Sequence, residues 1–145
     1  MAAQGETREK RRILVCYDGS GESARALSRA AEIASAVPSE VTVVSVADPI
    51  YGEPPYTGYA DPIEEETHGT LLDNASRSLS AHGVTAATLE PVGDTVPAIL
   101  EAARETRADL IVVGCRHRPV IRRLLFGSVG GELAVEAPFD VFVVH

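Results

Sequence analysis

Short runs rich in β-branched residues alternate along this chain with longer stretches of helical periodicity. The apolar runs predict five strands, at 13–17, 41–46, 84–89, 109–114 and 141–144. Apolar residues spaced three and four positions apart predict four helices, at 21–37, from about 64 to 82, from 94 onward and at 128–137. Strands separated by helices specify a parallel sheet with right-handed crossovers and helices on both faces. We therefore expect an α/β fold, a three-layer doubly wound sandwich.

The ends of the predicted helices carry recognisable signals. Pro38 stops the first helix, Gly83 suits the position just past the second, and Asp94 is a candidate N-cap of the third. The first helix is expected to bury Leu27, Ala30, Ala34 and Val37, and the second Leu71, Leu72, Ala75 and Leu79. Ligands of doubly wound sheets bind beyond the carboxyl ends of the strands, so the turns after strands one and four are the places to inspect.

Length and composition narrow the class of protein. A chain of 145 residues fits one domain, which we expect at 12–145 after a flexible N-terminal segment at 1–11. Hydrophobic residues make up 45% and charged residues 23%, no apolar stretch approaches the roughly 20 residues that cross a bilayer, and the N-terminus lacks the apolar core of a secretory signal. We expect a cytoplasmic protein without a membrane partner.

The charges exclude one large class of partner and suggest another. A formal net charge of -8 argues against binding to nucleic acid, because phosphate backbones favour clustered Lys and Arg. Four arginines nevertheless fall in one short segment: Arg116, Arg118, Arg122 and Arg123. This patch either contacts a small phosphate-bearing ligand or is a solvated loop. The two cysteines, Cys16 and Cys115, are expected to be free thiols, and the scattered histidines do not resemble a metal site.

The turn after the fourth strand, 114–128, carries the most specific chemistry. Gly127 and Ser128 stand where a helix begins, and the unpaired amides and dipole of a helix N-terminus favour an anion such as phosphate. Gly114 allows close approach of a ligand to the strand end. The alternative is that Gly127 and Ser128 are simply an N-cap.

Four segments together resemble the universal stress protein family. They are the turn 18–20 after the first strand, the pair 93–94 before the third helix, the stretch 108–114 and the segment 127–129. The resemblance extends from about residue 12 to residue 145. It implies a five-stranded parallel sheet in the order 3-2-1-4-5, of the adenine nucleotide alpha hydrolase-like type, and a role in the stress response.

The resemblance also implies a ligand. Nucleotide-binding members of the family hold ATP through Gly, two residues, Gly, nine residues, Gly and Ser or Thr, and this chain matches with Gly114, Gly127 and Ser128 but has His117 at the second glycine. By resemblance, Asp18 meets the adenosine end, Val46 the adenine, and Gly114, Gly127, Ser128 and Val129 the phosphates. ADP and AMP are alternative ligands, and Mg would accompany the nucleotide. His117 either obstructs the phosphates or offers them an imidazole, with Arg116 as a second contact.

The resemblance and the residues lead to one main functional hypothesis, a nucleotide-responsive regulatory module. The same resemblance implies a homodimer through the last strand, at 139–144. No residues suggest a catalytic triad or a phosphate loop containing Gly-Lys-Ser, so we expect no enzyme, or at most slow incidental hydrolysis of ATP. Two alternatives stay open: a nucleotide-independent dimeric interaction protein whose phosphate site is altered by His117, and a weak ATPase or phosphotransferase that depends on Mg and Ser128.

Overall fold

The computed structural model describes residues 10–47, 62–114 and 140–145. Its strands are β1 (Arg11–Cys16), β2 (Ser39–Val44), β3 (Ala86–Leu89), β4 (Leu110–Gly114) and β5 (Asp140–Val144). Its helices are α1 (Gly21–Ala36), α2 (Pro62–Ala81) and α3 (Thr95–Glu105). The helix expected at 128–137 lies outside the described residues.

The five strands form one sheet in the order β3-β2-β1-β4-β5, and every pair is parallel. This confirms the predicted fold class and strand order. β1 lies in the middle, with Cys16 opposite Val44 of β2 and Val15 opposite Val112 of β4. Because all strands run the same way, their carboxyl ends share one edge of the sheet, which we call the C-terminal edge. The opposite edge is the N-terminal edge.

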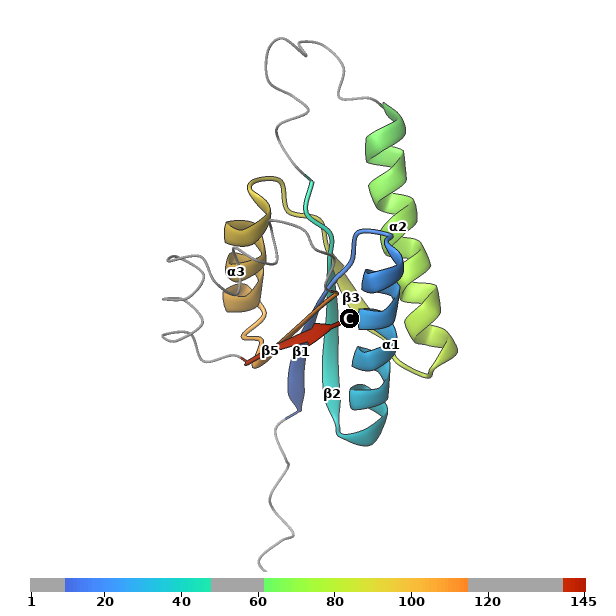
Figure 1. Cartoon of the computed structure of the whole chain (residues 1–145), viewed down its shortest axis with the longest axis vertical. Helices are drawn as coiled ribbons and strands as arrows, with labels where there is room; N and C mark the ends of the chain where they lie inside the picture. Colours follow the sequence, from blue (N-terminus) through green and yellow to red (C-terminus); the bar gives the residue numbers. More distant parts are fainter. Residues whose placement is uncertain (1–9, 48–61, 115–139) are drawn as a thin grey trace, which may run out of the picture.

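Helices cover the sheet from both sides, with α1 and α2 on one face and α3 on the other (Figure 1). Side chains of β1 alternate between the faces, so that Val15 packs toward α1 and α2 while Leu14 packs toward α3. Both are fully buried, as is typical of a central parallel strand. Along the part of the chain that is described, no helix combines the length and the apolar character needed to cross a membrane.

Two strands begin earlier than the apolar runs predict. The backbone N–H of Arg11 donates to the carbonyl of Pro38 at 2.8 Å, and Arg11 and Arg12 pair with Ser39 and Glu40. The hydrogen bonds between paired strands involve only backbone groups. Exposed charged residues can therefore continue a strand beyond its apolar run. At its other end β2 stops at Val44, two residues before the predicted end, although the N–H of Tyr17 still donates to the carbonyl of Val44 at 3.0 Å.

Three further predictions need correction, two at helix ends and one at the start of β3. Val37 is the C-cap of α1 and is 37% exposed, so it does not belong to the buried stripe. Asp94 occupies the N-cap position of α3 as predicted, but its side chain makes no capping hydrogen bond. β3 begins at Ala86 because Val84 is engaged in ending α2.

The N-terminal edge is fastened by Asp109, which directly precedes β4. Its backbone N–H donates to the carbonyl of Arg12 at 2.9 Å, and its Oδ2 accepts from the N–H of Arg12 at 3.2 Å. Its own carbonyl accepts from the N–H of Asp140 at 2.8 Å. One residue thus joins the beginnings of β1, β4 and β5.

Gly83 ends α2 with a backbone hydrogen-bond motif that requires a residue with a positive φ, in the left-handed region. Its φ is +76°, its N–H donates to the carbonyl of Ser80 at 2.9 Å, and the N–H of Val84 donates to the carbonyl of Leu79 at 2.9 Å. This pair of bonds is the Schellman arrangement. It delivers Val84 to the core directly after the helix.

We expect Gly83→Ala to lower the free energy of unfolding by about 1–2 kcal/mol, because an L side chain is strained in the left-handed region. Gly69→Ala is the matched control within α2: Gly69 has ordinary helical backbone and open space around it, so alanine should stabilise by about 0.5–1 kcal/mol. Urea unfolding of both variants measures the difference. Equal effects of the two substitutions would contradict the assignment.

Candidate functional site

The structure brings three of the predicted site residues together at the C-terminal edge. Asp18 and Val46 each lie two residues beyond the last pair of β1 and β2, Cys16 with Val44, and Gly114 is the last residue of β4. These three strands are neighbours in the sheet. The other predicted site residues, Arg116, His117, Gly127, Ser128 and Val129, lie outside the described residues, so their roles stay predictions.

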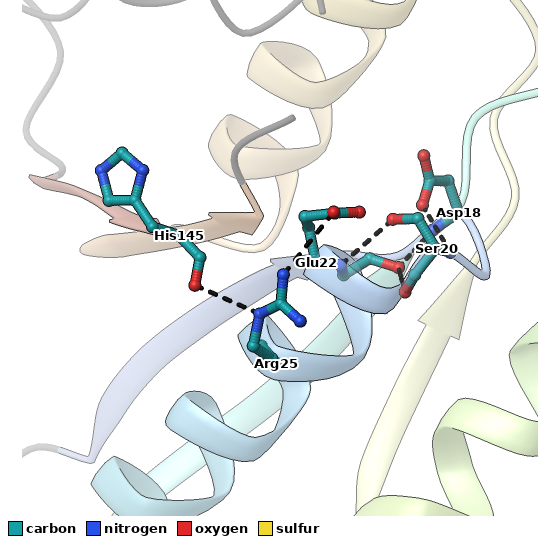
Figure 2. A network of polar contacts seen from close by, with 6 residues as sticks. Asp18, Ser20, Glu22, Arg25 and His145 are labelled. Carbon is teal, nitrogen blue, oxygen red and sulfur yellow. Dashed lines mark hydrogen bonds and ion pairs between the residues drawn. The ribbon is translucent and has the colours of Figure 1, made fainter. Parts of the chain in front are cut away.

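The turn that carries Asp18 is held by a compact set of hydrogen bonds (Figure 2). Oδ1 of Asp18 accepts from the backbone N–H of Ser20 at 2.9 Å, and the backbone N–H of Asp18 donates to Oγ of Ser23 at 3.4 Å. Gly19 between them has a φ of +82°, which favours glycine. The carboxylate of Asp18 is therefore fixed in orientation before any ligand arrives.

Ser20 and Ser23 begin α1 and complete this turn. Oγ of Ser20 accepts from the N–H of Ser23 at 3.1 Å, which is an N-cap, and the hydroxyl of Ser23 donates back to the carbonyl of Ser20 at 2.9 Å. Ser20 therefore caps the helix, and Ser23 connects that cap to the turn. Because Ser23 is buried, its hydroxyl is committed to the turn rather than to a ligand.

Gly114 makes a close contact with α1 that requires glycine. A β-carbon on Gly114 would lie 2.5 Å from the backbone carbonyl carbon and oxygen of Glu22 and 2.8 Å from the nitrogen of Ser23. Real β-carbons do not come so near to other backbone atoms. The fold itself therefore requires glycine at this position, and the expected approach of a phosphate to the backbone of Gly114 stays a prediction.

Val46 keeps its predicted neighbourhood, although it lies beyond β2. It is partly buried against the apolar cluster under α3. The pairing with the segment after β3 continues past it, because the N–H of Ala47 donates to Pro91 at 2.9 Å and the carbonyl of Ala47 accepts from Gly93 at 3.0 Å. Val46 thus presents an apolar surface at the same edge as Asp18.

Arg25 is a site neighbour that the sequence analysis missed. Its Nε donates to the backbone carbonyl of His145 at 3.1 Å, and its Nη2 lies 3.6 Å from Oε1 of Glu22 (Figure 2). Arg25 and His145 are 120 positions apart, so helical periodicity shows only that Arg25 lies on the polar face of its helix. The topology, which places β5 beside α1, is what brings them together.

Cys16 is adjacent to this turn but is not a nucleophile. Burial, together with the negative charge of Asp18, raises the pKa of its thiol to about 12. The thiol therefore stays protonated at neutral pH, and the thiolate is the reactive form. Within 10–47, 62–114 and 140–145, no three His, Cys, Asp or Glu side chains gather closely enough to hold a metal ion.

A groove of about 460 Å³ opens between the end of β3 and α3. Its lining includes apolar residues such as Leu89 and Val92 and four carboxylates, those of Glu90, Asp94, Glu101 and Glu105. Among the residues that the structure describes, no basic side chain lines it. Carboxylates repel phosphate, so this side of the edge is unsuited to the charged end of a nucleotide.

The comparisons with known proteins agree with this architecture. The family model described as "Universal stress protein family" matches residues 10–145. The chain belongs to the universal stress protein family. Among curated universal stress proteins, one from Thermus aquaticus is 33% identical over 138 residues, covering 92% of this chain and 97% of the relative. Another, Rv1636 of Mycobacterium tuberculosis, is 33% identical over 144 residues, with 92% and 94% covered.

Solved structures of universal stress proteins share the fold. A crystal structure of a universal stress protein in complex with cAMP has a TM-score of 0.68 and 30% identity, and the match covers 93% of this chain and 97% of that one. The universal stress protein of Archaeoglobus fulgidus in complex with dAMP has a TM-score of 0.67 at 22% identity, covering 94% and 98%. At that identity the second likeness supports the fold alone.

We expect Gly114→Ala to destabilise this universal stress protein by about 1–3 kcal/mol, because the added methyl group meets backbone that cannot rotate away. Gly21→Ala in the same turn is the control, since its β-carbon would meet only the end of Arg25 at 3.8 Å. That variant should stay within about 0.5 kcal/mol of the parent. Thermal unfolding followed by circular dichroism measures both, and a Gly114→Ala protein as stable as the parent would refute the contact.

Proposed function

We propose that this universal stress protein binds an adenine nucleotide at the C-terminal edge of β1, β2 and β4 and acts as a nucleotide-responsive regulatory module in the stress response. The observation that carries the proposal is the likeness to the universal stress protein crystallised with cAMP, at 30% identity over nearly the whole of both chains. The fixed turn at Asp18 and the apolar Val46 at the same edge support it.

The described residues suit the nucleoside end of such a ligand. The carboxylate of Asp18 is an acceptor already oriented by Ser20, and a hydrogen bond between a charged and a neutral group is worth more than one between two neutral groups. Val46 supplies apolar contact for the flat face of a base. We assign the phosphates to the predicted residues Arg116, His117, Gly127, Ser128 and Val129, away from the carboxylates beside α3.

ATP is the proposed ligand, with ADP and AMP as alternatives and Mg bound with the phosphates. The output that we propose is regulation and not turnover. The sequence offers no arrangement that would activate a water molecule, and the part of the chain that is described holds no site for a metal of its own. A cytoplasmic location is part of the proposal.

The proposal includes a homodimer formed through the segment 139–144. β5 is the last strand of the described sheet, and a strand with a free side offers unpaired N–H and C=O groups to another copy. Phe142 in this strand is 41% exposed, which is unusual for so large an apolar side chain. A second β5 strand, or the helices beside it, would cover that surface.

We expect ATP to bind the purified chain, and Asp18→Asn to weaken binding about tenfold, since a hydrogen bond to a charged group is worth about 1.5–3 kcal/mol. Asparagine keeps the oxygen that accepts from Ser20, so the substitution removes the charge and preserves the turn. Asp73→Asn on the exposed side of α2 is the control and should bind as the parent does. Calorimetric titration measures the affinities, and native mass spectrometry of protein purified without nucleotide reports bound ligand and dimer together. Absence of ATP, ADP and AMP binding at millimolar ligand would refute the proposal.

His117→Gly separates the proposal from the nucleotide-independent alternative. Under the proposal the unmodified chain binds ATP, and the substitution changes its affinity: weaker binding identifies the imidazole as a ligand, and tighter binding identifies it as an obstruction. Under the alternative, His117 closes the site, so only the glycine variant binds. The same titration, with ADP and AMP alongside, distinguishes these results.

A further inference from the structure

The first turn of α1 and the ends of β4 and β5 form a closed ring of contacts. Gly114 lies against the backbone of Glu22 and Ser23, and it pairs with Val144 across the sheet. The next residue, His145, accepts the hydrogen bond from Arg25, which returns to α1 one turn after Glu22 (Figure 2). Each step of the ring is a direct contact.

This ring of contacts joins the turn of Asp18, which is proposed to bind the nucleoside, to β5, which is proposed to form the dimer. On one side, Ser23 is bonded to Asp18 and Ser20, the turn assigned above to the nucleoside. On the other side, β5 is the outermost strand of the described sheet, held by β4 along one side. The pairing of Gly114 with Val144 is the last between these strands, and beyond it the guanidinium of Arg25 holds the chain to α1.

We propose that Arg25 couples the nucleotide site to β5: a ligand that orders the first turn of α1 also orders the end of β5, and the reverse. This inference rests on the proposed nucleotide binding. Coupling between two sites is reciprocal, so order imposed on β5 by a second copy of the chain tightens nucleotide binding by the same factor by which nucleotide favours association. Arg25 acts here as a positioning residue, because it holds β5 and does not itself reach for the ligand.

The chemistry of Arg25 suits this role. Glu22, whose side chain is 24% exposed, orients the guanidinium from one side, and the planar group directs Nε at the carbonyl of the residue just past the end of β5. The arginine is 55% exposed, so the link is modest in strength. A weak contact suits a coupling function, because the end of β5 can detach from Arg25 and bind to it again.

Hydrogen exchange followed by mass spectrometry tests the inference on the full chain, tagged at its N-terminus to leave His145 unaltered. We expect saturating ATP to slow exchange at 141–144 about threefold in the parent protein, in keeping with an exposed charged contact. Arg25→Gln should abolish this slowing while ATP still binds. Arg29→Gln is the matched control: Arg29 is 53% exposed one turn along the same helix and pairs only locally, with Glu32 at 3.0 Å, so it should respond as the parent does.

Glu22→Gln provides a second variant if Arg25→Gln does not fold, and it should reduce the slowing because the guanidinium loses its orienting carboxylate. If ATP binds the parent but exchange at 141–144 does not change, or if Arg25→Gln responds as the parent does, the coupling is overturned while nucleotide binding stands. If the parent binds no nucleotide in calorimetry, the proposed function falls and this inference falls with it.

Discussion

The approach of one backbone to another, without a side chain between them, decides how the C-terminal edge of the sheet is built. Gly114 ends the strand next to the central one, and the first turn of α1 rests directly on it. A larger residue would move the helix outward, and the hydrogen bonds from Ser23 to the Asp18 turn would move with it. The position of the Asp18 carboxylate, the candidate acceptor, thus depends on Gly114, which has a hydrogen atom where every other residue has a β-carbon.

The core and the site are made from different parts of the chain. Strand residues such as Val15 and Leu14 fill the two apolar layers and are shielded on both faces of the sheet. The site residues begin where the strands stop, in turns whose polar groups bond to one another before they meet a ligand. Packing therefore sets the frame, while short-range hydrogen bonds set the orientation of the carboxylate of Asp18. This separation lets binding residues vary without loss of the core.

Sequence patterns predicted the fold well because buried parallel strands and amphipathic helices have distinct periods. The strand order came from a resemblance and was confirmed, as was the end of α2 at Gly83. Strand boundaries were less accurate, since backbone pairing at Arg11 does not depend on an apolar side chain. The contact between Arg25 and His145 had no local signal at all, because only the assembled sheet brings the two residues together. For the same reason the contact of Gly114 with the first turn of α1 could not be predicted from the sequence.

Asp109 gives the sheet a mechanical asymmetry. It fastens the beginnings of three strands, whereas no comparable residue among those described ties the same strands at their other end except through α1. From Asp109 to Gly114 a strand rises by about 16 Å. If the strands rotate slightly about Asp109, the displacement grows with distance from that residue. It is therefore larger where Asp18 and Gly114 lie. Asp109 is thus the fixed end of the sheet, held by two backbone hydrogen bonds and one to its carboxylate, and the turns at Asp18 and Gly114 lie at the end that such a rotation moves most.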